Sequence, residues 1–453
     1  MADSGSRPDI AALARDAGII GAGGAGFPTH VKISAKPETL IANGVECEPL
    51  LCADRELMRL HADRVVEGLM AVKGQTGAGR AVIGLKAHYE EACAAFEALP
   101  GYGEAFALHR LKSTYPIGDE QQLIYEITGR VVPTGGLPLD VGAVVCNVNT
   151  LYNIAEALEG RPVTDRIVTV GGHVDEPVTK IAPIGASIGR LLASAGVHFD
   201  PGSQSIVIGG PCMGAVTKDT GIPVTKTTGG ALVFPDGHPL LRARKDLLSS
   251  DFLLARAVCC NCSMCTQLCP RNLLGLKVEP HKAMRAFAYG NADLMDSPNG
   301  VFSCCECGVC TYYSCNFGLR PSLIMKELKT AMGKAGVKPE KKAFTAPSES
   351  IASSRLPTGR LVARLGLAEY DRYAPLDEGN PVETDRVRIP MNMHIGAPSV
   401  PVVKKGDAVR KGQLIAEIRE GALGARVHAS IGGIVAEAGD VVEIVKKDKE
   451  AAS

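Results

Sequence analysis

The stretch of sequence that decides the fold is CCNCSMCTQLCP at residues 259–270, and a related stretch, CCECGVCTYYSC, occupies residues 304–315. Ten of the chain's 15 cysteines lie in these two stretches. The N-terminal sequence MADSGSRPDIAALARDAG has neither the basic region nor the apolar core of a secretory signal, so we expect a reducing compartment in which disulfides are rare. Clustered thiols in such a chain predict metal ligation.

The first stretch has the spacing Cys-x2-Cys-x2-Cys-x3-Cys-Pro, with which a [4Fe–4S] cluster takes three thiolates from one run and its fourth from a distant run. The second stretch has the same spacing with one extra residue before its last cysteine. The sequence therefore predicts two clusters with exchanged fourth ligands. One is assigned to Cys259, Cys262, Cys265 and Cys315, and the other to Cys304, Cys307, Cys310 and Cys269.

A pair of zinc knuckles is the alternative for these stretches, because Cys-x2-Cys pairs also bind Zn²⁺. Structural zinc sites take two separated pairs rather than a run of three cysteines with a displaced fourth, so the spacing favours clusters. Cys260 and Cys305 stand beside the first ligand of each run and are interpreted as packed or spare thiols. The other five cysteines are dispersed and are predicted to be small buried hydrophobic side chains: Cys47, Cys52, Cys93, Cys146 and Cys212.

Length and charge limit the number of domains and the classes of partner that the chain can have. The chain has 453 residues, which predicts about three domains. Its 49 Lys and Arg residues balance 49 Asp and Glu residues, so we expect no nucleic-acid partner. No apolar run approaches the ~18–20 residues that a membrane-spanning helix needs, so we expect no membrane span.

A glycine-rich stretch near the N-terminus, GIIGAGGAGFPTHVK at residues 18–32, predicts a loop whose backbone N–H groups approach a phosphate or a ring closely. The pattern G-x-G-x-x-G fits there, but the Phe-Pro that follows disfavours the helix that a Rossmann site requires, so another flavin or nucleotide loop is favoured. Three further segments, NGVECEP, TYPIGDEQQLI and VCNVNT, predict polar groups at strand ends around a ligand. Each of them alone is equally consistent with an ordinary loop.

Together these motifs resemble the FMN and NADH site of the flavoprotein subunit of respiratory complex I and of its relative, the RnfC protein of Rnf-type electron-transport complexes. The order of the modules is more similar still to the cobalamin reductases of propanediol-utilisation microcompartments, in which the flavin domain comes first and a barrel-sandwich module comes last. The resemblance covers nearly the whole chain.

The resemblance implies which residues contact the flavin and the nicotinamide nucleotide. Lys32 would meet the FMN phosphate or ring, Asn43 and Glu46 would line the isoalloxazine, and Phe27 would stack on a ring of the nucleotide. Glu48 and Glu120 would meet ribose hydroxyls. The other implied cofactor-binding residues are Gly21, Gly23, Gly24, Gly26, Tyr115, Gly118, Asp119, Asn147 and Thr150.

The chain departs from the complex I pattern at three positions. Ala22 stands where the complex I flavoprotein has Arg, Val45 replaces an acidic residue before Glu46, and Cys146 replaces an Asn. The first two differences affect the expected binding of NADH more than the expected binding of flavin.

The middle and the C-terminal part of the chain complete the organisation. Alternating Ile and Val from residue 166 predict strands, a hairpin and a short helix over residues 188–195, and resemble the SLBB module, a ubiquitin-like β-grasp domain. GGPCMG at residues 209–214 is interpreted as a turn rather than a phosphate loop. The C-terminal repeats resemble the barrel-sandwich fold of lipoyl carriers, but Ala422-Leu423-Gly424-Ala425-Arg426 lacks the carrier lysine, which favours a docking or structural module.

The expected fold is therefore a multidomain α/β and α+β protein. It comprises a complex-I-flavoprotein-like FMN domain (residues 1–165), an SLBB β-grasp domain (166–240), an α-helical ferredoxin-like domain with two [4Fe–4S] clusters (241–332), a linker (333–385) and an all-β barrel-sandwich hybrid of the RnfC type (386–447).

The expected function follows from the resemblance and from cofactor chemistry. A flavin accepts two electrons as hydride from NADH and releases them singly, and each cluster carries one. We expect electrons to pass from NADH to FMN, to the two clusters and then to a corrinoid, reducing cob(III)alamin or cob(II)alamin to cob(I)alamin. No side chain is required as an acid, base or nucleophile.

The partners implied are NADH, a corrinoid or corrinoid-handling enzyme and microcompartment shell proteins, and the expected location is the cytoplasm within a bacterial microcompartment. The alternatives are an Rnf-like electron-input subunit of a membrane complex, and a carrier or scaffold protein that binds no flavin.

Overall fold

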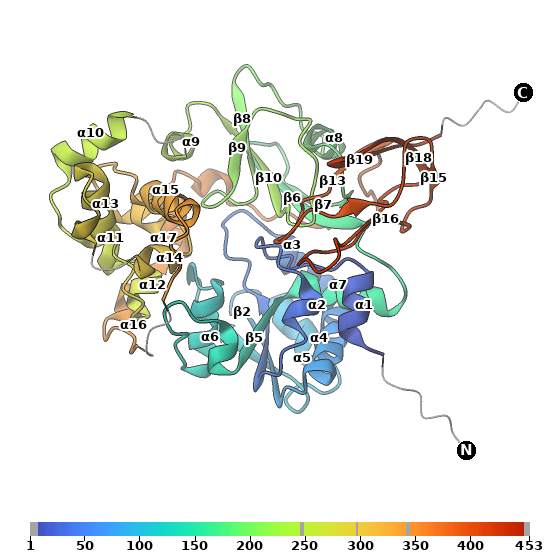
Figure 1. The fold of residues 1–453 in the computed structure, drawn as a ribbon, viewed down its shortest axis with the longest axis horizontal. Coiled ribbons are helices and arrows are strands. Elements are labelled where there is room, and N and C mark those ends of the chain that lie inside the picture. The colour runs from blue at the N-terminus through green and yellow to red at the C-terminus, as the bar shows by residue number, and fades with distance from the viewer. Residues whose placement is uncertain (1–7, 245–248, 296–297, 341–344, 448–453) are drawn as a thin grey trace, which may run out of the picture.

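The computed structural model describes residues 8–244, 249–295, 298–340 and 345–447, and Figure 1 shows how its units follow one another around the molecule. The first unit is built on a parallel four-stranded sheet with the strand order β3-β2-β1-β5. Its strands are β1 (Thr39–Gly44), β2 (Arg80–Lys86), β3 (Ala107–Leu111) and β5 (Ala143–Asn147). Their centres are rich in Ile, Val and Leu because helices cover both faces of the sheet, as parallel sheets require.

Helices cover the two faces of this sheet unequally. The elements packed on one face are α1 (Ile10–Asp16), α3 (Ala53–Leu60), α4 (Ala62–Thr76), α5 (Glu90–Glu97) and α7 (Val148–Leu158), and α6 (Glu120–Thr128) packs on the other. Helices α4 and α7 approach closely at Gly68, because glycine has no side chain. A Cβ at this position would lie only 1.9 Å from the carbonyl oxygen of Leu151. Because the strands are parallel, the loops that follow β1 and β5 meet at one edge of the sheet.

The second unit is a mixed six-stranded sheet with the order β12-β7-β6-β10-β8-β9. The strands are β6 (Asp165–Gly172), β7 (Val178–Pro183), β8 (Gln204–Ile208), β9 (Ala215–Thr217), β10 (Gly230–Pro235) and β12 (Leu376–Asp377). Strands β6 and β7 form the expected hairpin, and β10 lies parallel to β6. The predicted helix is confirmed as α8 (Ile188–Ser194), where the Ser187 side chain accepts the Arg190 N–H as an N-cap.

The third unit is helical and lies on the left of Figure 1. Its elements are α9 (Pro239–Ala243), α10 (Ser249–Val258), α11 (Met264–Gln267), α12 (Pro270–Leu273), α13 (Pro280–Tyr289), α14 (Asn299–Phe302) and α15 (Pro321–Lys334). Proline occupies the first turn of α12, α13 and α15, where its missing N–H costs no hydrogen bond. The all-α prediction for the cysteine-bearing segment is therefore confirmed.

The segment that the sequence predicted to be a linker is packed against three other units. Strand β11 (Leu356–Pro357) pairs with β4 (Thr114–Tyr115) of the first unit, α17 (Thr358–Arg364) follows it, and β12 joins the edge of the second sheet. Leu361 and Leu367 are fully buried. The Pro- and Ser-rich composition indicated a linker wrongly here, because its few leucines are buried between neighbouring units.

The C-terminal unit consists of two small antiparallel sheets. The first contains β13 (Arg386–Pro390), β15 (Ala408–Val409), β18 (Gly433–Ala438) and β19 (Val441–Val445), and the second contains β14 (Val400–Pro401), β16 (Leu414–Glu417) and β17 (Val427–His428). Their inner side chains belong to the same hydrophobic core as the helices of the first unit. Within the described residues, no helix combines the length and apolar character that crossing a bilayer requires.

Candidate functional site

The cysteines of the first stretch enclose a cavity in the helical unit. Cys259, Cys262 and Cys265 line it, and Cys315 of the second stretch completes the lining. Burial raises the pKa of Cys265 to about 12, and the Cys315, Cys259 and Cys262 thiols add to the effect. Bound metal reverses this preference because a coordinating thiol loses its proton. The structure thus places these four thiols around one cavity, which supports their assignment to one cluster.

The other four cysteines gather in the same way. Cys269, Cys307 and Cys310 are buried. Burial raises the pKa of Cys269 most strongly, and the Cys304 thiol raises it further. The two side chains therefore lie close together. Cys265 of the first group contributes in turn to the raised pKa of Cys310, so the two groups are neighbours. The assignment of the eight thiols as cluster ligands remains a prediction that this grouping supports.

The extra residue in the second stretch has a structural cause. Residues Cys310–Ser314 form a π-helix (η3), in which the chain takes one residue more per turn than in an α-helix. The Ser314 hydroxyl donates to the Val309 carbonyl at 3.1 Å, and the Thr311 and Ser322 hydroxyls are 2.6 Å apart. The wider turn absorbs the additional residue, and Cys315 still reaches the cavity of the first group.

The two cysteine loops repeat the same backbone conformation. Asn261 and Ser263 have positive φ values of 55° and 60° in the first loop, and Glu306 and Gly308 have φ values of 58° and 78° at the equivalent positions of the second. Non-glycine residues in the left-handed region are strained and persist where surrounding structure requires them. The repeated strain is consistent with two equivalent ligand loops.

The glycine-rich stretch forms a loop between α1 and α2 (Thr29–Lys32), and only the tip of this loop, residues 23–25, is exposed. Its ends are joined by a hydrogen bond from the Gly21 N–H to the Phe27 carbonyl at 2.8 Å, and Phe27 itself is half-buried. Gly24 and Gly26 have φ values of 112° and 67°, which glycine adopts without strain. Helix α1 rather than a strand precedes the loop, so the site differs from a Rossmann site. The short helix α2 nevertheless begins at Thr29, directly after Pro28, where the sequence disfavoured a helix.

The loop lies over the carboxyl ends of β1 and β5. Asn43 and Asn147 are register partners on these strands. A Cβ at Gly23 would lie 3.5 Å from the Asn147 Cβ, and the Ala22 N–H donates to the Thr150 hydroxyl at 2.9 Å. Asn147 also caps α7, since its side-chain oxygen accepts the Asn149 N–H at 2.9 Å.

Lys32 and Glu120, which the resemblance placed at the cofactors, pair with each other beside these strand ends. The Lys32 ammonium donates to Glu120 Oε1 and to the Val145 carbonyl, both at 2.8 Å. Burial alone would lower the pKa of Lys32, but Glu120 outweighs this effect and the pKa is raised. The Asn43 amide donates to the Gly118 carbonyl at 2.9 Å, which ties the β1 loop to the loop before α6.

Glu46 lies at the base of this region in a conformation with φ 45°. Its carboxylate accepts the backbone N–H groups of Asp54 and Arg55, at 2.9 and 3.0 Å, at the start of α3. Burial and the neighbouring Asp54 carboxylate raise the pKa of Glu46 to about 8. The Asn147 amide donates to Asp54 at 2.6 Å, so the acidic pair is tied to the strand ends.

The residues present fit a flavin mononucleotide. Gly23, Gly24 and Ala25 are exposed and leave backbone N–H groups accessible, and the N-terminus of α7 opens beneath them. A helix N-terminus favours a phosphate because its N–H groups are unpaired and its dipole is positive there. The side-chain amide of Asn149 is buried there beside the Asp54 carboxyl, and its nitrogen makes no well-formed hydrogen bond among the described residues.

Tyr115 and Asp119, which the resemblance placed at the flavin, and Glu48, which it placed at the nucleotide ribose, make contacts with other units. The Tyr115 hydroxyl lies 3.0 Å from Glu48 Oε1 and 2.8 Å from the Cys307 carbonyl. The second oxygen of Glu48 accepts the Cys212 N–H at 2.7 Å, which fixes the GGPCMG turn. Asp119 accepts two hydrogen bonds from Arg271, at 2.6 and 2.7 Å. These side chains join the first unit, which carries the glycine loop and is called the flavin unit below, to the second and third units.

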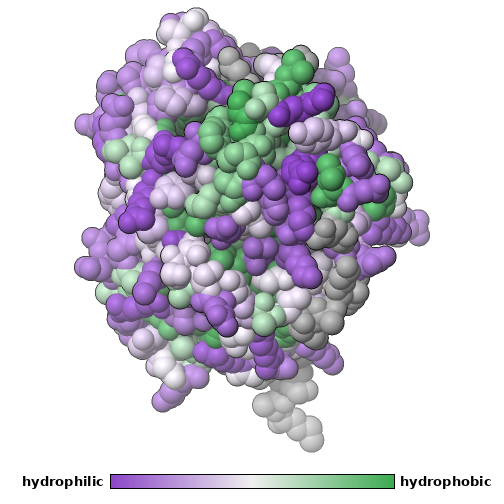
Figure 2. Space-filling model, turned by 90° about the vertical axis from the view of Figure 1, so that its left-hand side faces the viewer, coloured by the Kyte–Doolittle hydropathy of each residue, from purple (hydrophilic) through white to green (hydrophobic). Residues whose placement is uncertain are grey.

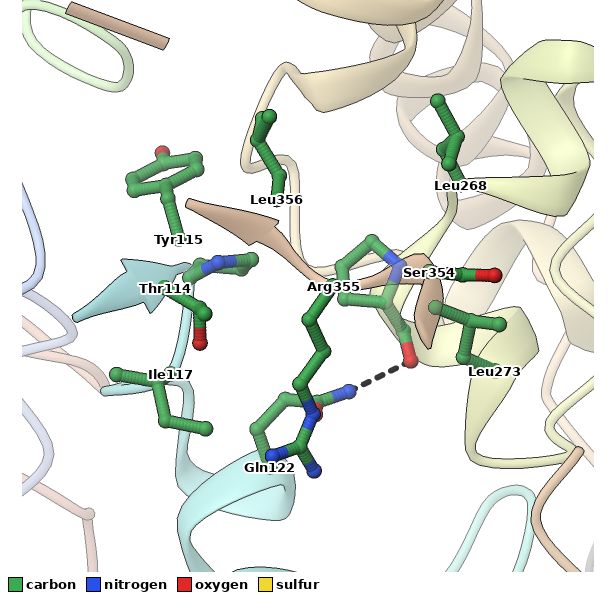
Figure 3. Close-up of a pocket in the computed structure, with 11 residues that line it drawn as sticks. Thr114, Tyr115, Ile117, Gln122, Leu268, Leu273, Ser354, Arg355 and Leu356 are labelled. Atoms are coloured by element: carbon green, nitrogen blue, oxygen red, sulfur yellow. Dashed lines mark hydrogen bonds between the residues drawn. The ribbon is translucent and has the colours of Figure 1, made fainter. Parts of the chain in front are cut away.

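Figure 3 shows this junction between the flavin unit and the cysteine-bearing unit. The Gln122 amide donates to the Pro270 carbonyl at 2.6 Å, at a small pocket that Tyr115, Leu273 and Arg355 also line. Gln122 and Arg271 are contacts that sequence reasoning did not identify. No local signal distinguishes them, because each depends on a partner about 150 residues away.

The dispersed cysteines are placed as expected for small hydrophobic side chains, with one exception. Cys52, Cys93, Cys146 and Cys212 are buried, and Cys47 is half-buried with its sulfur accepting the Gly118 N–H at 3.3 Å. Cys305 is half-buried and Cys260 is exposed.

Comparison with known proteins gives three family matches along the chain. A model of the Nuo51 FMN-binding domain matches residues 14–156, a 4Fe-4S dicluster domain matches residues 258–320, and the RnfC barrel sandwich hybrid domain matches residues 378–452. The dicluster match decides against the zinc alternative.

Curated relatives match over most of the chain. The chain is 42% identical over 434 residues to cobalamin reductase PduS of Salmonella typhimurium, covering 95% of this chain and 94% of the relative. It is 41% identical over 427 residues to the PduS of Citrobacter freundii, covering 93% of each. A component of the Na⁺-translocating ferredoxin:NAD⁺ oxidoreductase complex of Acetobacterium woodii is 35% identical over 275 residues, which are 59% of each chain.

Proposed function

Because the chain belongs to the family of the PduS cobalamin reductases, we propose that it oxidises NADH and delivers the electrons singly, through a flavin and two [4Fe–4S] clusters, to a corrinoid. The observation that carries the proposal is the direct junction between the glycine-loop unit and the cysteine-bearing unit. FMN, when bound, supplies the conversion of a two-electron hydride donor into one-electron transfers. The chain itself contributes binding, orientation and spacing.

The residues around the glycine loop have binding roles. The exposed N–H groups of the loop and the N-terminus of α7 would hold the FMN phosphate and ring, with Lys32, Asn43, Gly118 and Asn147 around them. Phe27 and Glu120 remain the candidates for the nicotinamide nucleotide. Glu48, Tyr115 and Asp119 are better assigned to the junctions between units, since their polar atoms are bonded there.

The junction also orders the two cysteine groups relative to the flavin. Three contacts from the flavin unit reach the segments that carry the second group: Tyr115 to the Cys307 carbonyl, Gln122 to the Pro270 carbonyl, and Asp119 to Arg271. The first group has two exposed members of its loop, Cys260 and Cys262. Electrons therefore enter at the group of Cys304, Cys307, Cys310 and Cys269, and leave from the group of Cys262.

The exit face is apolar for a protein surface. The face formed by the helical unit carries a band of hydrophobic residues (Figure 2). Exposed apolar side chains of this unit are Leu253, Leu254, Met264, Tyr289 and Phe317. Phe317 lines the cavity of the first group, so an acceptor that docks there comes close to that group.

Finer features of the resemblance are part of the same proposal. We infer that the second unit is an SLBB β-grasp domain, which the β6–β7 hairpin, α8 and the parallel pairing of β10 with β6 support. The boundaries at residues 165, 240, 332 and 385 remain predictions. A microcompartment interior with shell proteins or a corrinoid-handling enzyme as partners is proposed from family membership, and co-purification with shell proteins tests it.

An Rnf-like electron-input subunit is the second candidate, because the RnfC domain matches the C-terminal unit. The lengths favour the first candidate, since the alignment covers 93% of a cobalamin reductase but 59% of the Acetobacterium protein.

The experiment is an anaerobic assay of NADH oxidation against cob(II)alamin, ferredoxin and a quinone, with FMN and iron measured on the same sample. We expect one FMN, two clusters' worth of iron and NADH-dependent formation of cob(I)alamin. Reduction of ferredoxin or quinone without any reduction of cobalamin would favour the Rnf-like candidate. Full iron content without flavin would favour a carrier or scaffold.

A further inference from the structure

The glycine loop is held from outside the flavin unit at three of its carbonyl groups. The carbonyl oxygens of Gly18, Ala22 and Gly26 accept hydrogen bonds from residues of the second and the C-terminal units. The flavin unit alone therefore does not determine the conformation of the loop.

The first of these contacts comes from Arg166 on β6. One Nη nitrogen donates to the Ala22 carbonyl at 2.8 Å, and its Nε donates to the Thr228 carbonyl at 2.9 Å. The guanidinium is buried, and its other Nη nitrogen has no hydrogen-bond partner among the described residues. Burial lowers the pKa of Arg166, and Asp54 and Glu46 oppose this effect, so the three side chains form one buried cluster beneath the loop.

The second contact comes from Lys226, in the loop before β10. Its ammonium donates to the Gly18 carbonyl at 2.6 Å and to the Arg426 carbonyl of the C-terminal unit at 2.7 Å. Lys226 is 2% exposed, so it joins three units at one buried point. Gly18 must be glycine here, because it has a φ of 69° and a Cβ would lie 2.3 Å from the Arg426 oxygen.

The third contact comes from the C-terminal unit itself. The Ile395 N–H donates to the Gly26 carbonyl at 3.0 Å. A Cβ at Gly26 would lie 3.3 Å from the Thr227 methyl and 3.4 Å from the His394 Cα. The far end of the glycine loop is thus enclosed by the second and the C-terminal units.

These contacts also determine the direction in which the N–H groups of the loop point. In a trans peptide the carbonyl of one residue and the N–H of the next point in opposite directions. Holding the Ala22 and Gly26 carbonyls inward therefore turns the N–H groups of Gly23 and Phe27 outward. Among the described residues, neither of these N–H groups has a hydrogen-bond partner.

We propose that Arg166 and Lys226 of the second unit and the Ile395 segment of the C-terminal unit are positioning residues of the flavin site, holding the loop so that its N–H groups face the bound flavin. This inference rests on the proposed binding of FMN. It assigns the C-terminal barrel-sandwich unit a role in positioning the glycine loop, instead of the role of a lipoyl carrier, whose lysine this chain lacks. It also places a buried guanidinium beneath the loop, from another unit, near the position where Ala22 replaces the arginine of the complex I pattern.

The test uses the full chain, deflavinated and titrated with FMN, with flavin fluorescence as the readout. Arg166→Met and Lys226→Met remove the contacts, Arg166→Lys retains the charge, and Lys180→Met is the matched control. Lys180 is an equally buried lysine of the same sheet, but it pairs with Asp377 rather than with the loop. Iron content and thermal melting of each variant report the fold separately.

We expect Arg166→Met and Lys226→Met to weaken FMN binding by about ten- to hundred-fold, since each removes buried hydrogen bonds to the loop. Arg166→Lys should recover part of the affinity. The midpoint potential of the retained flavin should fall in Arg166→Met, because a nearby cation favours the reduced flavin.

Unchanged FMN affinity in both methionine variants would overturn the inference, and so would an equal loss in Lys180→Met. These results leave the proposed function intact. A parent chain that takes up no FMN overturns the proposed function together with the inference, so the two failures are distinguishable.

Discussion

Replacing Asp119 by asparagine tests whether this residue serves the flavin or the junction between units. Asp119 and Arg271 form a bidentate ion pair at 2.6 and 2.7 Å, with side chains only 10% and 12% exposed. Burial alone would lower the pKa of Arg271, but Asp119 outweighs burial and the pKa is raised. A guanidinium stays protonated in proteins even without a partner, so Arg271 remains charged and buried when Asp119→Asn removes its carboxylate.

The magnitude follows from the burial of the pair. Removing one partner of a buried ion pair costs about 3–5 kcal/mol, because the remaining charge is left without compensation. The asparagine oxygen keeps one neutral hydrogen bond, worth about 1 kcal/mol, which leaves a loss of ~2–4 kcal/mol. Glu38→Gln is the matched control: Glu38 pairs with Arg130 at 2.7 Å, but the side chains are 67% and 50% exposed. An exposed pair of this kind is worth less than about 1 kcal/mol.

The assay is equilibrium unfolding in urea, followed by tyrosine fluorescence because the chain has no tryptophan, together with the visible absorbance of the clusters. FMN affinity is measured on the same variants. We expect Asp119→Asn to lose stability and to slow NADH-dependent reduction of the clusters, with FMN affinity unchanged. Weakened FMN binding with unaltered stability would refute the reasoning and return Asp119 to the flavin pocket.

Three further predictions concern other parts of the site. Glu46→Gln should flatten the pH dependence of the free energy of unfolding. The pKa of Glu46 is raised from 4.5 to about 8, so the parent loses up to ~1.4 kcal/mol of this free energy per pH unit as pH rises between these values. Urea unfolding at pH 5 and pH 8 measures the difference between parent and variant. Deleting Tyr313 should restore the three-residue spacing that the first stretch has between its last two cysteines, so both clusters should be retained, and loss of one cluster by iron analysis would contradict the role of the π-helix in absorbing the extra residue. Tyr115→Phe should cost about 1–3 kcal/mol in urea unfolding, because the buried Cys307 carbonyl loses its donor, and a neutral result would contradict this.

The cysteine groups could be predicted from the sequence because ligand spacing is a local property. Three thiolates on a short loop reach three corners of a cluster wherever the loop lies in the fold. The π-helix could not be predicted, since the extra residue before Cys315 matters only relative to a cavity formed by the other stretch. The polar segments were expected to converge at strand ends, and Asn43 and Asn147 are register partners at the ends of β1 and β5.

The junction residues were the part that sequence reasoning placed least well. Tyr115, Glu48 and Asp119 lie in motifs that resemble a flavin pocket, but their partners are Cys307, Cys212 and Arg271, in other units. No periodicity or composition reports such docking. The predicted linker was wrong for the same reason, since buried leucines such as Leu361 acquire their neighbours only when the units assemble.

The central claim is that NADH electrons cross the chain from the flavin through the Cys307 group and then the Cys262 group to a corrinoid. The most direct measurement is anaerobic mixing of NADH and cob(II)alamin with Cys262→Ala and Cys307→Ala variants, followed by absorbance and by EPR of the frozen samples. The account predicts that NADH still reduces one cluster in Cys262→Ala and none in Cys307→Ala, and that neither variant forms cob(I)alamin. Formation of cob(I)alamin by Cys262→Ala at the rate of the parent chain would contradict it.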